Sequence, residues 1–451
     1  MEALQQLAYF VQDFSLDQVS EDVIRAARMC VLDSVGSALG AARSEGTPEL
    51  TKNWMRFAAG STNAMADVWG QGIRADMMSA LLLNGMLGHA LELDDVHTGS
   101  KSHVGTVIVQ TAWTVADAMG LCGRQMLEAV IVGYEVMART GMGMDVTSNR
   151  KRGWHTTGII GTLGAAAAAA RLLGLTREET THALGIAAMQ SAGLWGFLAE
   201  GATCKRLSPG RAAANGLTAA ILAQGGMTGP VHALDAQDGG LYRAVSDAFD
   251  MAKLTDGLGV DYAVMHIDKK PYPCCRTTHH AIDAGIAFHE EGIDTARIQS
   301  IEVETYEVGV LQCGFTKYPE SPVEAKFSIP FTLAVGLTRG HVKQQDFCME
   351  TLQDPEVRRL AQHTSVVADP MFSDRYPKRW GSRTKLFMNN GECLEKQIDD
   401  MSGSIKRPLS EKQEKDKFIG LAETAFETDR VLELMDAILR IEALSVLPSL
   451  R

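Results

Sequence analysis

The chain has 451 residues, 45% of them hydrophobic and 22% charged, and its formal net charge at pH 7 is −12. The length predicts two domains, and an acidic chain without a stripe of Lys and Arg excludes a nucleic-acid-binding surface. No apolar run reaches the roughly 18 residues that a membrane-spanning helix requires. We therefore expect neither a nucleic-acid partner nor a membrane partner.

The start of the chain predicts a cytoplasmic protein. Residues 1–13 contain two acidic residues, no Lys or Arg and no small-residue cleavage site, which is unlike a secretory signal or a transit peptide. The eight cysteines stand at positions 30, 122, 204, 274, 275, 313, 348 and 393. They lack the paired spacing of a zinc or iron–sulfur site, so we expect reduced thiols.

The first 250 residues or so predict a series of helices, because apolar residues recur at spacings of three and four and glycines stand at the ends. Gly174 ends one helix, and Thr176 with Glu179 forms the capping box that starts the next. The Gly- and Ala-rich stretches 161–170 and 212–223 indicate interior helices. Helices are expected after Ser20 and at about 48–58, 76–92, 105–120, 124–141, 158–173, 177–193 and 209–225.

The pattern changes from about residue 265 onward. Residues 298–308 alternate as in a strand, and residues 384–388 and 392–397 flank an Asn-Asn-Gly turn as in a hairpin. Helices are expected at 327–337 and 355–363, and a last helical stretch at 411–444. The sequence therefore predicts a mainly α protein in which residues 1–265 and 405–451 form a helical domain and residues 266–404 form an α+β domain.

The first group of chemically active side chains follows the helix that ends near residue 90. It consists of Glu92, Asp94, Asp95, His97 and His103. Acids beside imidazoles could bind a metal, or could orient a base and a substrate without one. The His-x-x-x-His spacing of a helical metal site is absent, so we favour a metal-free active-site loop over a metal site or a solvated loop.

Two further groups stand at the starts of small-residue helices. His155 and Thr156 precede the Gly- and Ala-rich helix, and Lys205 lies shortly before Pro209 and Gly210. A helix N-terminus presents unpaired N–H groups and suits a carboxylate. A structural histidine and a surface lysine are the alternatives.

The fourth group lies in "KKPYPCCRTTHHAIDAG", where potential cations gather in an acidic chain. Its cations are Lys269, Lys270, Arg276, His279 and His280, and polyanion binding is the simplest reason for them. Cys275 would be a nucleophile only with a lowered pKa, and no catalytic partner is identifiable. The dinucleotide, ATP and hydrolase motifs are absent from the sequence.

Seven segments, in this order, resemble the MmgE/PrpD family. They are "NGMLGHALELDD", "IVGYEV", "GWHTTGIIGTLGAAAAAARLLGL", "ALGIAAMQSAGL", "KRLSPGRAAANGLTAAILAQGGMTGP", "KPYPCCRTTHHAIDA" and "EAKFSIPFTLA". The resemblance implies a helical domain built from both ends of the chain, a smaller α+β domain and a homodimer. It also implies a cofactor-free and metal-free enzyme for compounds such as 2-methylcitrate, cis-aconitate and iminodisuccinate.

The family pattern also implies site residues. Carried over to this chain, it points to Asp94, Asp95, His103, His155, Lys205, Lys270 and Tyr318. The chain departs from the pattern twice: relatives commonly have Asp-x-Asp-Asp-Thr where residues 92–96 read Glu-Leu-Asp-Asp-Val, and the decarboxylases have His where Cys275 stands. The second departure disfavours decarboxylation.

We therefore expect a lyase that removes an acidic carbon-bound proton from a small polycarboxylate. Lys205, Lys270, His103 and His155 are expected around the substrate carboxylates, with His155 or Lys205 as base and Asp94 and Asp95 orienting His103 or binding a hydroxyl. The remaining expected substrate-binding residues are Glu92, Thr156, Cys275, His279 and Tyr318. A 2-methylcitrate dehydratase-like activity is the first expectation; an epimerase or isomerase, a decarboxylase and a non-catalytic polycarboxylate-binding protein are the alternatives.

Overall fold

The computed structural model describes residues 1–58 and 64–451, which fall into two compact units. The first unit comprises Met1–Trp195, Cys204–Asp268 and Ser410–Arg451, and the second comprises Gly196–Thr203 and Lys269–Leu409. The expected class, mainly α with an α+β region in the second half, is confirmed. No helix among the described residues has the length and apolar character needed to cross a membrane.

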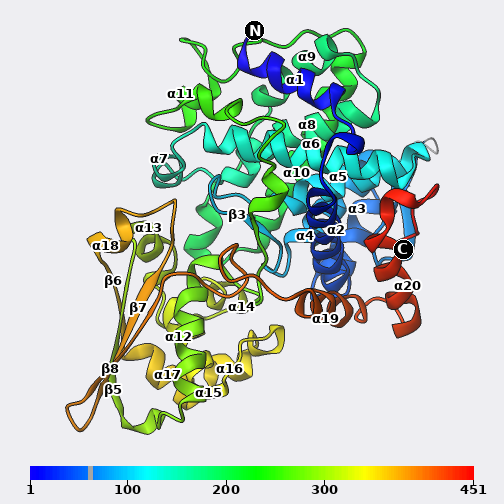
Figure 1. The fold of residues 1–451 in the computed structure, drawn as a ribbon. Coiled ribbons are helices and arrows are strands. Elements are labelled where there is room, and N and C mark those ends of the chain that lie inside the picture. Colours follow the sequence, from blue (N-terminus) through cyan, green and yellow to red (C-terminus); the bar gives the residue numbers. More distant parts are fainter. Residues whose placement is uncertain (59–63) are drawn as a thin grey trace. The chain divides into compact units, whose positions relative to one another are not determined.

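The first unit is a helical assembly with two small two-stranded sheets (Figure 1). Its helices are α1 (Ala3–Asp13), α2 (Glu21–Ala41), α3 (Thr47–Met55), α4 (Met77–His89), α5 (Gly105–Met119), α6 (Gly123–Met142), α7 (Val146–Lys151), α8 (Thr156–Leu172), α9 (Arg177–Met189), α10 (Leu207–Gln224), α11 (Leu241–Val245), α19 (Glu411–Ala422) and α20 (Thr428–Leu439). The antiparallel strand pairs are β1 (Met65–Val68) with β2 (Ile73–Asp76), and β3 (Val96–His97) with β4 (Ile267–Asp268).

Helix α8 lies at the centre of this unit, as its composition predicts. Every residue from 156 to 170 is buried, and α5, α6, α9 and α10 pack around it. A Cβ on Gly216 of α10 would lie 2.6 Å from the backbone nitrogen of Ala166 in α8. Small side chains therefore permit the close helix approach that buries α8 on all sides.

The predicted start of α9 is also confirmed. The Thr176 hydroxyl accepts from the amide of Glu179 at 3.2 Å, and Glu179 accepts in return from the amide of Thr176 at 2.7 Å. Ser20 stands at the N-cap of α2, but its side chain makes no capping hydrogen bond. The helix predicted for 76–92 ends at His89, so Glu92 lies in the loop after the helix.

The chain returns to the first unit at its C-terminal end. Helix α19 packs on α2, where Phe418 lies so close to Gly36 that an added Cβ would be 3.0 Å from its ring. The predicted last helical stretch is divided into α19 and α20. Residues more than 370 apart in sequence therefore lie side by side in this unit.

The second unit contains a four-stranded sheet in the order β6–β5–β7–β8. Its strands are β5 (Ile298–Thr305), β6 (Thr364–Ala368), β7 (Ser382–Met388) and β8 (Cys393–Ile398). Strand β6 runs parallel to β5, and the other neighbours are antiparallel. The predicted hairpin is confirmed, with Gly391 at φ +86° in its turn, whereas sequence reasoning missed β6.

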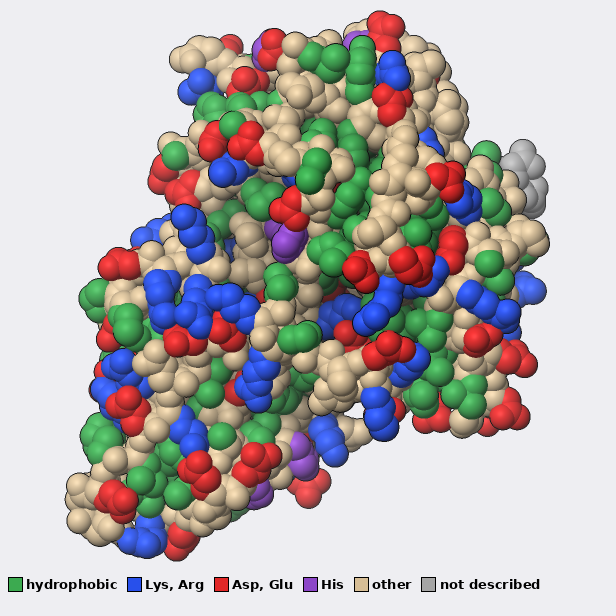
Figure 2. Space-filling model, in the orientation of Figure 1, with side chains coloured by type: hydrophobic (Ala, Val, Ile, Leu, Met, Phe, Trp, Pro, Cys, Tyr) green, Lys and Arg blue, Asp and Glu red, His purple; other side chains and the backbone are tan. Residues whose placement is uncertain are grey.

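Helices complete the second unit. They are α12 (His279–Glu290), α13 (Glu307–Gly309), α14 (Pro322–Ala325), α15 (Ile329–Arg339), α16 (Met349–Gln353), α17 (Pro355–Gln362) and α18 (Pro370–Ser373). Helix α12 packs against α15. On the face drawn in Figure 2, basic and acidic side chains are interspersed.

Candidate active site

The loop between α4 and α5 is anchored from both sides. The Asp95 carboxylate accepts from the amide of Gly105 at 2.8 Å and from the hydroxyl of Tyr134 at 2.6 Å. The Lys417 ammonium of α19 donates to the backbone oxygen of Leu93 at 2.8 Å and to Asp33 at 2.7 Å. These contacts fix the backbone on which Glu92 and Asp94 stand.

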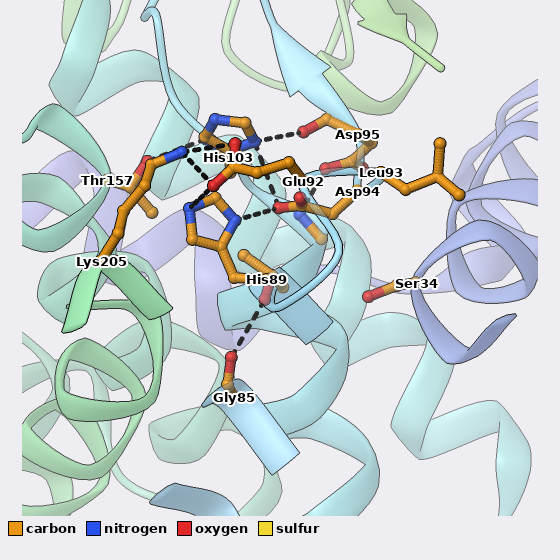
Figure 3. Close-up of polar contacts among 12 residues, drawn as sticks. Ser34, Gly85, His89, Glu92, Leu93, Asp94, Asp95, His103, Thr157 and Lys205 are labelled. Carbon is orange, nitrogen blue, oxygen red and sulfur yellow. Dashed lines mark hydrogen bonds and ion pairs between the residues drawn. The ribbon is translucent and has the colours of Figure 1, made fainter. Parts of the chain in front are cut away.

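Asp94 lies between two imidazoles (Figure 3). Its Oδ2 is 2.8 Å from Nδ1 of His89 and 3.1 Å from Nδ1 of His103. Burial by itself raises the pKa of Asp94, but the charges of and hydrogen bonds from the two histidines outweigh it and hold that pKa well below its usual value. An ionised Asp94 therefore orients both rings.

His155 is the third histidine of this cluster and the N-cap residue of α8. Its ring stacks at 6.1 Å from that of His89 and meets Trp195 edge-on at 5.4 Å. Burial, followed by the charges of Lys205 and the other histidines, lowers the pKa of His155 well below its usual value. His155 is therefore a neutral imidazole near pH 7.

Two threonines at the start of α8 have different roles. The Thr157 hydroxyl accepts from the amide of His103 at 3.0 Å and so joins the loop to α8. The Thr156 hydroxyl donates to Asn149 at 3.1 Å, and Thr156 is buried. Thr156, predicted to bind substrate, thus holds α7 against α8.

Lys205 reaches the cluster from a 3₁₀ turn, Thr203–Arg206, just before α10. Its ammonium donates to both carboxylate oxygens of Glu92, at 2.5 and 2.6 Å, and lies 5.9 Å from the centre of the Trp195 ring. Figure 3 shows the Glu92 carboxylate between Lys205 and His89. The immediate partner of Lys205 is therefore a carboxylate of the protein itself.

Asp95 and His97 are buried acid and imidazole groups of the same loop. Burial and the charge of Asp33 raise the pKa of Asp95 to about 7, although the hydrogen bonds from Tyr134 and Gly105 lower it. His97 lies on β3, where its Nδ1 accepts from the amide of Ser100 at 3.1 Å, and burial lowers its pKa to about 4. Asp95 also meets the histidine cluster through its backbone oxygen, 3.1 Å from Nδ1 of His103, and its predicted catalytic role stays a prediction.

Among the residues that the structure describes, one group lies close enough together to hold a metal ion. It consists of His89, Asp94 and His103, whose ligand atoms lie within 4.8 Å of one another. The same Asp94 oxygen already lies within hydrogen-bonding distance of both Nδ1 atoms. The arrangement fits an aspartate that orients two imidazoles.

The second unit holds its own group of buried cations. Lys270 and His279 are fully buried and Arg276 nearly so. Burial, followed by the charges of Lys270 and Arg276, lowers the pKa of His279 well below its usual value. The Sγ atom of Cys275 accepts from the amide of Gln312 at 3.1 Å.

Tyr318 lies apart from these second-unit residues. It is 51% exposed and lines a surface pocket with Lys317, Glu320 and Arg358. The lining of that pocket includes none of Lys270, Cys275 and His279.

Comparison with known proteins places the chain in a family. The model of the MmgE/PrpD N-terminal domain matches residues 5–253, and that of the MmgE/PrpD C-terminal domain matches residues 272–441. The chain belongs to the MmgE/PrpD family. The sequence-based recognition of this family is thereby confirmed.

Relatives of this MmgE/PrpD chain are lyases of two kinds. Cis-aconitate decarboxylase of Aspergillus terreus is 24% identical over 98% of this chain and 93% of its own length, and the mouse enzyme is 25% identical over 97% and 90%. The 2-methylcitrate dehydratase of Escherichia coli strain K12 is 22% identical over 78% and 74%. The expected class of enzyme, a lyase, is therefore supported at low identity.

Sequence reasoning missed two residues that contact the loop between α4 and α5. His89, the last residue of α4, has a signal in hindsight, because it is a polar residue at the end of an apolar helix, five positions before Asp94. Lys417 has no such signal, because it lies 324 positions from the Leu93 carbonyl that it binds.

Proposed function

We propose that this MmgE/PrpD protein is a lyase that removes the proton beside a carboxylate of a small polycarboxylate and expels a β-hydroxyl as water, as a 2-methylcitrate dehydratase does. The observation that carries the proposal is the ionised Asp94 between two imidazoles, with the Lys205 ammonium beside them. A base and a fixed cation in one buried cluster are the parts that proton abstraction beside a carboxylate requires.

Lys205 and His155 stabilise the charge that develops. When the carbon-bound proton leaves, its electrons move onto the neighbouring carboxylate and form an enediolate dianion. A fixed ammonium and a neutral imidazole N–H stabilise this dianion more than they stabilise the substrate, because its charge is higher. The lowered pKa of His155 keeps it neutral and thus able to donate without adding charge.

His103 is the base in this proposal, in place of the His155 or Lys205 of the sequence-based hypothesis. The ionised Asp94 accepts from Nδ1 of His103, which leaves the lone pair on Nε2 to take the substrate proton. The His103 side chain is 15% exposed, whereas that of His89 is fully buried, so a substrate reaches His103 first. His103 then passes the proton that it has taken to the β-hydroxyl, which leaves as water, and a carbon–carbon double bond forms.

Decarboxylation is the second candidate ending, because the relatives named cis-aconitate decarboxylase match almost the whole chain. Both endings are formulated without a cofactor or a metal ion. The residues Lys270, Cys275, His279 and Tyr318 remain sequence-based predictions of substrate binding.

The test is proton NMR in heavy water with citrate-like, aconitate-like and amino-dicarboxylate compounds. We expect deuterium at a carbon beside a carboxylate together with loss of water, unaffected by EDTA and abolished in Lys205→Ala and His103→Asn. The variant His232→Asn is the matched control, because His232 is an exposed histidine bonded to Asp235, and it should keep full exchange.

Each other outcome has a defined meaning. Release of carbon dioxide would favour the second candidate, and exchange with inversion but no loss of a group would replace both with an epimerase. Activity lost with EDTA would make His89, Asp94 and His103 metal ligands. Binding without any exchange would make the protein a polycarboxylate-binding protein and overturn the proposal.

We also propose that the protein is a cytoplasmic homodimer. All eight cysteines are free thiols, which suits a reducing compartment. Exposed apolar side chains at Met189, Leu207 and Leu222 offer a surface for a second copy. Light scattering should give twice the chain mass of 48.7 kDa, and cell fractionation checks the location.

A further inference from the structure

The Lys205 ammonium, which the proposed function assigns to a substrate carboxylate, is already occupied by a carboxylate of the protein. Glu92 accepts from Nζ of Lys205 through Oε1 at 2.5 Å and Oε2 at 2.6 Å. Only 7% of each side chain is exposed. A substrate that approaches Lys205 therefore meets a filled anion site.

The backbone of Glu92 supports a specific purpose for this pair. Its φ of 58° lies in the left-handed region, which residues other than glycine rarely adopt. Such residues persist only where their surroundings fix them, and they gather at functional sites. Leu91 and Leu93 on either side are buried, so the loop is fixed on both flanks of the strained residue. In this backbone conformation the Glu92 side chain reaches Lys205.

The Glu92 carboxylate has a second place within reach. Its Oε1 lies 3.8 Å from Nε2 of His89, and this buried nitrogen makes no hydrogen bond within residues 1–58 and 64–451. Because the ionised Asp94 accepts from Nδ1 of His89, Nε2 can donate to Glu92 only after it takes up a proton from solvent. With that proton in place, a rotation of the glutamate side chain would replace its bond to Lys205 with one from His89. The movement is short because both partners lie on the same side of the loop (Figure 3).

We propose that Glu92 is a specificity-determining residue that competes with the substrate for Lys205. When a substrate carboxylate takes its place, Glu92 turns to Nε2 of His89, which takes up a proton from solvent and donates to it. This inference rests on the proposed function, in which Lys205 binds a substrate carboxylate. Exchange of one carboxylate for another on the same ammonium changes the free energy little, so a monocarboxylate gains too little to remain bound. A polycarboxylate adds contacts through its other groups and is selected.

The test is titration calorimetry with tricarballylate, which has three carboxylates and no hydroxyl to eliminate. Glu92→Gln removes the competing charge, and we expect the Kd of tricarballylate for this variant to be about tenfold lower than for the wild type. This factor applies if Glu92 leaves Lys205 accessible in about one wild-type molecule in ten. Acetate should bind measurably to this variant and not to the wild type. Glu128→Gln is the matched control, since Glu128 is similarly buried and pairs with Arg171 at 2.9 Å, and its Kd should equal that of the wild type.

Equal or weaker binding of tricarballylate to Glu92→Gln overturns the inference. If that variant does not fold, Glu92→Asp is tested instead. Its side chain is one methylene shorter, so its carboxylate should end about 1.5 Å short of Lys205. This variant should therefore also bind tricarballylate more tightly than the wild type. If Lys205→Ala loses tricarballylate binding but neither Glu92 variant binds more tightly, the inference about Glu92 is overturned and the proposed function stands. If tricarballylate binds Lys205→Ala as tightly as the wild type, or binds none of these proteins, the proposed function is overturned as well.

Discussion

The two units place different charged side chains beside their buried histidines. In the first unit the carboxylates of Glu92 and Asp94 lie against the Lys205 ammonium and two imidazoles. In the second unit the charges that act on His279 are those of Lys270 and Arg276, both cationic. Carboxylates that orient imidazoles suit the transfer of a proton, whereas buried cations beside an imidazole of lowered pKa suit the binding of an anion.

The largest expected effect comes from removing the carboxylate that orients the two imidazoles of the first unit. Asp94→Asn should lower kcat/KM about 10³-fold, because the amide no longer accepts from both imidazoles and the base loses its orientation. Steady-state kinetics against the proposed substrate measures it, with circular dichroism as a check of folding. A variant with near-normal turnover would mean that Asp94 only supports the loop.

A smaller effect is expected from removing one cation of the second cluster. Lys270→Met should raise KM and lower kcat/KM about 10²-fold if the sequence-based prediction of substrate binding holds. The pKa of His279 should rise, since the Lys270 charge contributes to lowering it, and histidine NMR titration reports that change. Unchanged kinetics with the shifted histidine would make the second cluster structural.

The smallest expected effect is on the pH dependence of stability when Asp95 is replaced by asparagine. Burial raises the pKa of Asp95 to about 7 in the folded state, from its ordinary value of 3.8. Between these pH values the folded state therefore binds more protons than the unfolded state. The wild type should therefore lose stability relative to Asp95→Asn as pH rises from about 4 to about 7. Melting curves at a series of pH values should show Asp95→Asn gaining about 2 °C by pH 8. A constant difference would contradict a buried, protonated Asp95.

The sequence was most informative where local chemistry determines structure. The capping box at Thr176 and the Asn-Asn-Gly turn act within a few residues, and small residues throughout 161–170 require close neighbours on all sides, so all three predictions are confirmed. The loop residues Glu92, Asp94 and His103 were predicted as one group, and they do lie together.

What the sequence left open depends on contacts between distant segments. The bond between Glu92 and Lys205 joins positions 113 apart, and no local pattern records it. Strand β6 was missed because its burial is partial and its pairing with β5 is set by the fold. The choice of His103 over His155 as base likewise depends on burial and on the position of Asp94, which only the folded chain reveals.

The contact from Lys417 to Asp33 and to the Leu93 carbonyl has a consequence for biosynthesis. A ribosome that has made the first 400 residues has already produced every acid, histidine and lysine of the first-unit cluster, but not the lysine that fixes their loop. Because chains fold from the N-terminus as they emerge, the loop gains this last support only near the end of translation. A transcript truncated shortly before residue 417 would therefore yield a protein that contains all these side chains yet does not hold them in place.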